Sequence, residues 1–230
     1  MADRSDLQHA RAGGDAEGAP PTPATTTPVQ AEYDGAGSLA AGYFDRLYAE
    51  HGDPWSFATS PYEAAKYRDT LRALPRPRYG NALEVGCSIG VLTRLLASRC
   101  DRLLAIDVSQ AALAQAATRC AGRGVRFERR ALPDDMPAGP FDLVVLSEVG
   151  YYWSGEALAA ARTAIGRQTR AGGHLLLVHY TGATNYPLTA HDVHSAFGAD
   201  PAWERITAVS RASYRLDLLG RARRDPGSRA

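Results

Sequence analysis

The stretch LEVGCSIG at residues 83–90 joins a strand pattern to a helix pattern. A short apolar segment (82–87) is typical of a buried strand, and a helical pattern begins directly after the stretch. Gly86 permits a sharp turn, and Gly90 permits backbone and ligand to approach each other, because glycine has no Cβ. The stretch therefore predicts a ligand site at the carboxyl end of a strand in an α/β sheet.

An acidic residue, Asp107, ends the next apolar run, about 20 residues beyond the turn. At this place a carboxylate can accept hydrogen bonds from both hydroxyls of an adenosine ribose. The alternative role is a helix cap, for which Ser109 is better placed. We therefore expect Asp107 to bind a ribose.

The residues around the turn also indicate which nucleotide fits. A dinucleotide turn needs its third glycine where this sequence has Val91, and Ser88 stands at the second position. Glu84 would repel a pyrophosphate, but it would stabilise a ligand that carries an ammonium and a sulfonium group. The sequence has no G-x-x-x-x-G-K-[ST] stretch for a nucleoside triphosphate. These features disfavour NAD and nucleoside triphosphates.

Along the chain, apolar strand patterns alternate with helical patterns, which predicts a parallel sheet with helices on both faces. The strand patterns lie at 82–87, 102–108, 125–130, 141–149, 173–180, 203–211 and 213–220. The helical patterns lie at 38–51, 60–74, 90–100, 109–122, 155–170 and 189–198. The last two strands follow each other directly, so a hairpin should place an antiparallel strand in the sheet. The expected fold is Rossmann-like α/β, with a mainly parallel seven-stranded sheet and an N-terminal helical lid.

Composition divides the chain into four segments. Residues 1–36 are rich in Pro, Gly, Ala and Thr and have few large apolar side chains, so we expect a disordered tail. Residues 37–76 would form the helical lid, 77–221 the ligand-binding core and 222–230 a flexible tail. A chain of 230 residues suffices for one such domain but not for two.

Charge and hydropathy disfavour several classes of protein. The net charge of +1 gives no basic face for nucleic acid. No run of about 18 apolar residues occurs, and the N-terminus lacks the apolar segment of a secretory signal, so we expect a cytoplasmic protein without a membrane span. The spacing of Cys87, Cys100 and Cys120 indicates reduced, buried thiols.

Several segments resemble the class I methyltransferases that use S-adenosylmethionine (SAM). They are LEVGCSIG, Asp107, FDLVVLSEV (141–149) and GGHLLLVHY (172–180). A narrower set is similar to the nodulation-type N-methyltransferases, whose rhizobial members methylate the amine of a deacetylated chitooligosaccharide. This set is YFDRLYAEHGDPWSFATSPYEAAKY (43–67), EVGCSIG (84–90) and SEVGYYW (147–153). The resemblance covers the chain from about residue 40 to 195, and it implies a class I methyltransferase fold with SAM as the cofactor.

The resemblance also implies which residues hold SAM. Residues of the turn would hold its methionine part, Asp107 its ribose, and the loop after the third strand its adenine. Ser88 stands where the general class I pattern most often has glycine. The cofactor-binding candidates are Glu84, Gly86, Cys87, Ser88, Gly90, Asp107, Val108, Ala131, Leu132 and Ser147.

Glu148, Tyr151 and His179 are the candidates for the catalytic chemistry. Methyl transfer from a sulfonium is an in-line displacement, so the protein must align the acceptor, and an amine must be neutral when it attacks. These three residues follow or end predicted strands, where a side chain could take or share the proton of the amine. The alternatives are an ion pair or a helix-start carboxylate for Glu148, and a satisfied buried histidine for His179.

Trp55, Tyr152 and His191 are the candidates for binding the acceptor. Trp55 lies on a loop broken by Gly and Pro, where it would either stack on a sugar or pack the lid. His191 and His194 lie three residues apart on a predicted helix, but no third ligand accompanies them. We therefore expect no metal site, and a place in the wall of the acceptor pocket fits His191 better.

The expected function is transfer of a methyl group from SAM to an amine of a small molecule, such as an amino sugar or glycoside. Methylation of a hydroxyl on a sugar or natural product is the nearest alternative, since a neutral amine and a hydroxyl can use similar bases. A degenerate SAM-binding subunit and an NAD-dependent reductase are the others. Glu84, Asp107 and Glu148 together argue against the first of these, and Val91 argues against the second.

Overall fold

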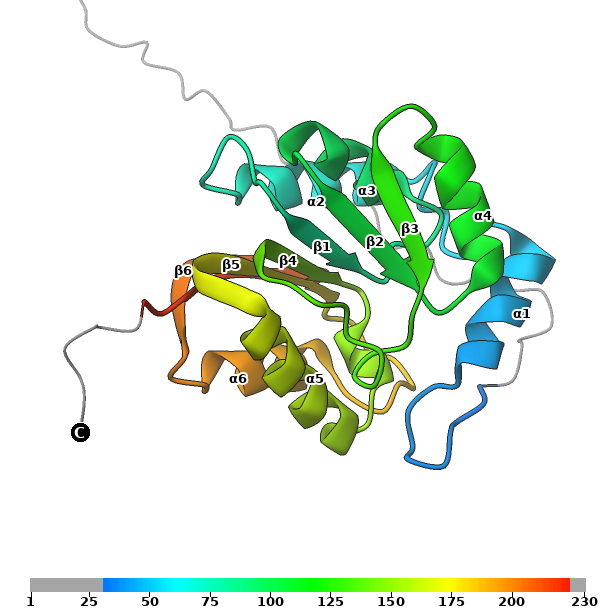
Figure 1. The fold of residues 1–230 in the computed structure, drawn as a ribbon. Helices are drawn as coiled ribbons and strands as arrows, with labels where there is room; N and C mark the ends of the chain where they lie inside the picture. The colour runs from blue at the N-terminus through cyan, green and yellow to red at the C-terminus, as the bar shows by residue number, and fades with distance from the viewer. Residues whose placement is uncertain (1–30, 224–230) are drawn as a thin grey trace, which may run out of the picture.

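The computed structural model describes residues 31–223, which form a seven-stranded sheet with helices on both faces (Figure 1). The strands are β1 (Ala82–Val85), β2 (Leu103–Asp107), β3 (Val125–Arg129), β4 (Phe141–Ser147), β5 (Thr169–Tyr180), β6 (Trp203–Ser210) and β7 (Tyr214–Arg221). They follow the order β3-β2-β1-β4-β5-β7-β6. The chain reverses its direction of travel across the sheet between β1 and β4, and open α/β sheets bind their ligands at this switch point.

The sheet is parallel except at one end. β1 pairs in parallel with β2 and β4, so that Leu83 lies beside Leu104 and Val144. β7 runs antiparallel to both β5 and β6, which confirms the hairpin expected from the sequence. The α/β fold with a mainly parallel seven-stranded sheet is likewise confirmed.

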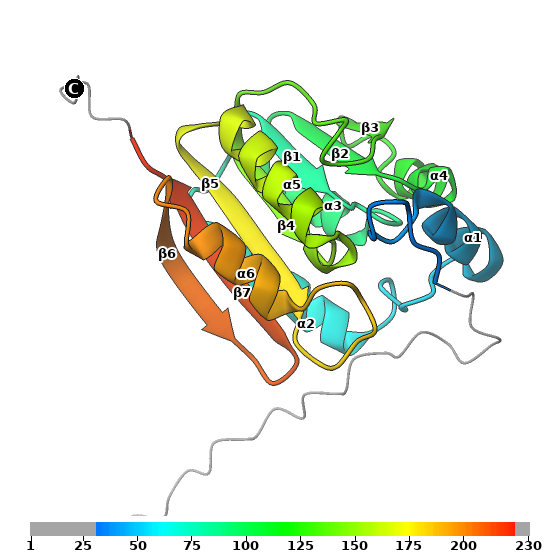
Figure 2. The same ribbon diagram turned by 90° about the horizontal axis from the view of Figure 1, so that it is seen from below.

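The helices cover the two faces of the sheet in two groups (Figures 1 and 2). They are α1 (Ala41–His51), α2 (Pro61–Arg72), α3 (Val91–Leu96), α4 (Gln110–Arg119), α5 (Gly155–Gln168) and α6 (Ala190–Gly198), with the short 3₁₀ helices η1 (Ala97–Arg99) and η2 (Gly150–Tyr152). α5 and α6 cover one face, and α2, α3 and α4 cover the other. Alternate strand residues serve the two cores, since Leu83 packs with α5 and Ala82 packs with α3. α1 packs beside α4 at the edge of this arrangement.

The helix starts show how local signals and tertiary contacts compete. Ser60 and Ser109 each accept a hydrogen bond from the backbone amide three residues on, and the second of these confirms the cap expected at Ser109. α1 begins at Ala41 rather than Ser38. The reason is that the Ser38 hydroxyl accepts a hydrogen bond from the Ser154 amide instead of capping a helix.

The tails expected at 1–36 and 222–230 largely lie outside the described residues, which leave out 1–30 and 224–230. Residues 31–36 turn back onto the fold, with an isolated bridge between Tyr33 and Leu39. The boundaries of the lid and core stay predictions. Within residues 31–223 no helix has the length and hydrophobicity needed to cross a bilayer. The three cysteines are free and buried, as expected.

Candidate active site

A cavity of about 540 Å³ lies where β1, β2 and β4 end. Most of the residues singled out from the sequence line it: Trp55, Glu84, Gly86, Cys87, Ser88, Asp107, Val108, Ala131, Leu132, Ser147, Glu148 and Tyr152. Gly90, Tyr151, His179 and His191 are not among its lining residues. The cavity therefore coincides with the switch point of the sheet.

Gly86 and Gly90 both adopt a positive φ, and neither position has room for a Cβ. Gly86 has a φ of 74°, and a Cβ there would lie 2.0 Å from Cγ2 of Val149. Gly90 has a φ of 80°, and a Cβ there would lie 2.8 Å from Cα of Ala116 in α4. The missing Cβ of Gly90 lets α3 begin directly against α4, and Gly90 is not among the residues that line the cavity.

Asp107 ties the turn after β1 to the start of α4. Its Oδ2 accepts a hydrogen bond from the Ser88 amide at 2.8 Å, and its Oδ1 accepts one from the Ser109 amide at 2.9 Å. Burial raises the pKa of Asp107, and these backbone hydrogen bonds act in the opposite direction. Asp107 thus supports a helix start and also lines the cavity, so the two roles considered for it are compatible.

Tyr48 of α1 contacts the same turn, which sequence reasoning missed. Its hydroxyl donates a hydrogen bond to Oγ of Ser88 at 2.6 Å. Tyr48 also meets Trp55 edge-on at a ring distance of 5.7 Å, and Trp55 stacks on Phe57 at 5.5 Å. All three rings line the cavity. Trp55 therefore packs against Tyr48 and Phe57 and also lines the cavity.

Glu84 presents a buried carboxylate oxygen without a partner. The residue is 2% exposed, and its Oε2 has no hydrogen-bond partner among the described residues. Burial is the largest cause that raises the pKa of Glu84, to about 8. A cationic ligand would supply the missing partner and favour the ionised form. The residue therefore fits the ammonium and sulfonium groups of SAM.

Acidic side chains predominate around the whole cavity. They are Asp34, Glu84, Asp107, Asp134, Glu148 and Glu156. Among the described lining residues Arg130 is the one with a cationic side chain, and it is already paired with Glu128 at 2.5 Å and with Asp135 at 2.7 Å. Such a cavity attracts cationic ligands.

Glu148, in the loop after β4, is held by three donors. Its φ of 57° lies in the left-handed region that residues other than glycine seldom adopt. Oε1 accepts a hydrogen bond from Nζ of Lys66 at 2.6 Å, and Oε2 accepts from the Tyr180 amide at 3.0 Å and from the Tyr151 hydroxyl. Tyr151 therefore orients Glu148 and does not itself line the cavity. The ion pair considered for Glu148 exists, and its carboxylate also lines the cavity.

Lys66 is a second residue that sequence reasoning missed. Its side chain is 2% exposed, and its Nζ also lies 2.9 Å from Oε1 of Glu63. Burial lowers the pKa of Lys66, but Glu148 and Glu63 together raise it by more, so the net shift is upward. The one available signal was that Lys66 is the only lysine in the sequence.

His179 is fully buried away from the cavity. Its Nε2 accepts a hydrogen bond from the Gly150 amide at 3.2 Å, and its Nδ1 lies 3.1 Å from Nε2 of His194. His194 in turn places Nδ1 2.9 Å from Oδ2 of Asp217. Burial lowers the pKa of His179 well below its usual value. The structure therefore places a neutral, satisfied histidine here, and His179 does not line the cavity.

His191 and His194 do not converge. His194 faces the buried Asp217, whereas His191 is exposed beside Ser195. The place in the pocket wall expected for His191 is therefore wrong, because the side chain lies on the outer side of α6. Within residues 31–223 no group of three or more His, Cys, Asp or Glu side chains is arranged to hold a metal ion.

Known protein sequences match the middle of this chain. The family model for Nodulation protein S (NodS) matches residues 45–179. Nodulation protein S of Sinorhizobium fredii (strain NBRC 101917 / NGR234) is 36% identical over 115 residues, which are 49% of this chain and 52% of the relative. Nodulation protein S of Rhizobium tropici is 33% identical over 129 residues, 54% and 53% of the two chains. The chain thus spans about half the length of the curated relatives it matches.

Solved structures share the fold. N-methyltransferase NodS from Bradyrhizobium japonicum WM9, in complex with S-adenosyl-L-homocysteine, has a TM-score of 0.71 at 23% identity and covers 79% of this chain and 98% of its own. A putative methyltransferase from Pseudomonas syringae has a TM-score of 0.62 at 34% identity, over 70% and 99% of the two chains. The described residues of this chain have the class I methyltransferase fold, and a family model matches more than half of its sequence, so the chain belongs to the Nodulation protein S (NodS) family.

Proposed function

We propose that this chain is a SAM-dependent N-methyltransferase that acts on an amine of a small molecule. The observation that carries the proposal is the partnerless buried Oε2 of Glu84 in a cavity bordered by carboxylates. Membership of the NodS family supports the activity. The similar NodS structure contains S-adenosyl-L-homocysteine, which is what SAM becomes when it gives up its methyl group.

The residues present fit SAM. Glu84 would balance its ammonium and sulfonium charges, Asp107 would accept hydrogen bonds from its ribose, and the loop with Ala131 and Leu132 would flank its adenine. When bound, SAM supplies a methyl group that the sulfonium has already activated. The residues of this chain therefore mainly need to orient the acceptor and exclude water, and the aromatic group around Trp55 suits the second task.

The surroundings of Glu148 favour an amine over a hydroxyl as the acceptor. A hydroxyl stays protonated near neutral pH and needs a general base, whereas an amine has only to lose the proton of its ammonium form. The oxygens of Glu148 already accept three hydrogen bonds, and no histidine from the described part of the chain lines the cavity. Glu148 is therefore better placed to attract an ammonium than to deprotonate a hydroxyl. Methylation of a hydroxyl is the alternative.

Among amines, we favour an amino sugar or glycoside. Trp55 and Phe57 line the cavity with flat aromatic faces, which suit stacking on a sugar ring. The resemblance to the nodulation-type enzymes points to the same class, a deacetylated chitooligosaccharide. Both considerations support a small-molecule partner with a carbohydrate part.

We expect the protein to methylate free amino sugars and deacetylated chitooligosaccharides, and not their N-acetylated counterparts. Release of S-adenosyl-L-homocysteine should be measured over a panel of matched free and acetylated acceptors, with the methylated atom identified by mass spectrometry. The rate should rise with pH as the amine deprotonates. Glu148→Gln should lower turnover far more than SAM affinity. An acetylated acceptor that reacts as fast as the free amine would establish O-methylation instead.

A further inference from the structure

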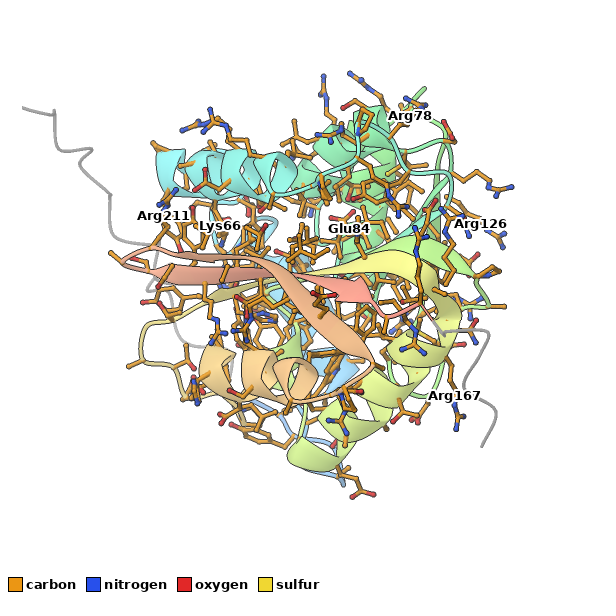
Figure 3. The ribbon with its side chains drawn as sticks, turned by 90° about the vertical axis from the view of Figure 1, so that its left-hand side faces the viewer. Lys66, Arg78, Glu84, Arg126, Arg167 and Arg211 are labelled. Atoms are coloured by element: carbon orange, nitrogen blue, oxygen red, sulfur yellow. The ribbon has the colours of Figure 1, made fainter. Side chains whose placement is uncertain are left out.

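α2 contributes two residues to a buried charged group, here called the Lys66 cluster, that consists of Glu63, Lys66 and Glu148. Nζ of Lys66 lies 2.9 Å from Oε1 of Glu63 and 2.6 Å from Oε1 of Glu148. The three side chains are 5%, 2% and 13% exposed, respectively. Figure 3 shows Lys66 between α2 and the sheet, whereas the arginines that it labels lie at the periphery.

Stability alone does not account for the Lys66 cluster. Moving ions out of water costs free energy that their mutual attraction only roughly offsets, and apolar residues of similar size usually stabilise such a contact at least as well. One oxygen of the cluster, Oε2 of Glu63, even lacks a hydrogen-bond partner among the described residues. The cluster reaches the cavity through Glu148, which makes a role at the site the better account.

We propose, building on the proposed function, that Lys66 and Glu63 are positioning residues for the methyl acceptor, acting through Glu148. Lys66 holds the carboxylate of Glu148 at the cavity wall, in the left-handed conformation that this residue would otherwise avoid. Glu63 offsets the charge of Lys66. Glu148 therefore presents its negative charge to the incoming ammonium undiminished.

The charges in the Lys66 cluster give Lys66 and Glu63 different roles. Two carboxylates and one ammonium leave a net charge of about −1. Without Glu63, the ammonium of Lys66 would cancel the charge of Glu148, and the acceptor would meet a neutral pair. Without Lys66, the two carboxylates would repel each other and Oε1 of Glu148 would lose its donor. Position thus depends on Lys66, and net charge depends on Glu63.

Two variants separate position from charge. Glu63→Gln keeps the contact between Lys66 and Glu148 but removes one negative charge, so KM for the amine should rise roughly 10-fold with kcat nearly constant. Lys66→Met combined with Glu63→Gln keeps one negative charge but removes the contact. In that double variant kcat should fall by on the order of 10-fold to 100-fold, with SAM affinity unchanged. Removing Glu63 together with Lys66 avoids leaving a second buried carboxylate without its cation, and Glu148 keeps its hydrogen bonds from the Tyr151 hydroxyl and the Tyr180 amide.

Arg68→Met is the matched control, because Arg68 is an exposed cation on the same helix. It should leave kcat and KM unchanged. In a Glu148→Gln background, adding the double substitution should cause no further loss of kcat, since Lys66 acts through Glu148. Wild-type kinetics in the double variant would overturn the proposal, and so would a further loss in the Glu148→Gln background.

A crystal structure of the double variant tests the positioning role without any assay of activity. We expect the Glu148 backbone to leave its φ of 57° and the carboxylate to leave the cavity wall. A Glu148 that stays in place would overturn the positioning role even if the enzyme methylates amines. If the wild-type protein methylates no amine, the proposed function fails, and the structure of the double variant still decides whether Lys66 positions Glu148.

Discussion

Glu84 buries a carboxyl group whose Oε2 has no hydrogen-bond partner among the described residues. Burial raises the pKa of Glu84 to about 8, whereas a glutamate in an unfolded chain titrates near about 4.3. Between these pH values the unfolded chain is ionised at this residue, while the free folded protein keeps the proton. Raising the pH through the window therefore lowers the stability of the free protein, and a bound cation reverses the effect.

Glu84→Gln should therefore separate stability from binding. The variant should exceed the wild-type thermal midpoint by more at pH 8.5 than at pH 5.5, because only the wild-type protein has a carboxyl group here that ionises on unfolding. Its affinity for SAM should fall at both pH values. Thermal unfolding and titration calorimetry at the two pH values provide the measurement. A variant that loses stability at pH 8.5 would show that Glu84 serves the fold instead.

The largest group of site residues that the sequence revealed, from Glu84 to Gly90, belongs to one strand–turn–helix unit. Asp107 could be found because its distance from the turn is set by a short local connection. Lys66 reaches Glu148 across 82 positions, and Tyr48 reaches Ser88 across 40. These contacts depend on how α1 and α2 pack over the sheet, and no local pattern encodes that packing.

At the level of elements, a directional chain of hydrogen bonds ties the loop after β4 to β5, α6 and β7. The Gly150 amide can only donate and the Asp217 carboxylate can only accept, so His179 and His194 each donate from Nδ1 and are both neutral. A proton on His194 would place hydrogens on both of its nitrogens. His179 could then no longer donate to it and would have to release Gly150, two residues after Glu148.

The pKa directions agree with this description. Burial, the largest cause, lowers the pKa values of His179 and His194. The neighbours His194 and Lys66 lower the pKa of His179 further. For His194, Asp217 raises the pKa, whereas Arg215 and Arg205 lower it. The unfolded chain thus takes up protons first, near about pH 6.5. Stability from these two residues is complete above that pH and is lost as the pH falls.

The variant His194→Gln tests this chain of hydrogen bonds between Gly150 and Asp217. The variant lacks the titrating group. The wild-type thermal midpoint should therefore exceed that of the variant by less at pH 5 than at pH 7. Taking the difference between the two proteins cancels the opposing contribution of Glu84, which is common to both. A difference in thermal midpoint that stays constant between pH 7 and pH 5 would show that His194 does not titrate as described.

The types of the α-helices and strands followed from the sequence patterns, but several of their boundaries depended on distant contacts. β5 begins at Thr169 rather than at 173, because Thr169 pairs with Phe141 across an irregular stretch of the ladder. Gly172, with a φ of 70°, lies just before the strand expected at 173–180 but falls within β5. Where β5 begins depends on its pairing with β4, and the local sequence pattern does not encode that pairing.

At the scale of the whole molecule, the segment before α1 closes one side of the cavity. Asp34, Ser38 and Leu39 line it, and the Leu39 amide donates a hydrogen bond to the Tyr152 carbonyl at 2.8 Å. Composition alone suggested a tail as far as residue 36. The contacts of 31–36 arise from the sheet and loops that they meet, which composition does not report.

Two truncations should therefore behave differently. Removal of residues 1–30 should leave the thermal midpoint and SAM affinity nearly unchanged, because that segment has few large apolar side chains. Removal of residues 1–40 should weaken SAM several-fold, because it takes away part of the cavity wall. Calorimetry on both proteins is the measurement. Equal affinities would contradict the role of 31–40, and a loss on the shorter truncation would show that residues 1–30 contribute.

The burial of Lys66 also has a consequence for protein chemistry. Of the 26 lysine and arginine residues in the sequence, it alone carries a primary amine on its side chain, and it is 2% exposed. An acylating reagent that spares guanidinium groups reaches this amine only when α2 separates from the sheet. The rate of acylation at Lys66 therefore measures how often α2 separates from the sheet, without any engineered label. For the same reason, the folded protein has no accessible lysine side chain for a lysine-directed crosslinker to modify.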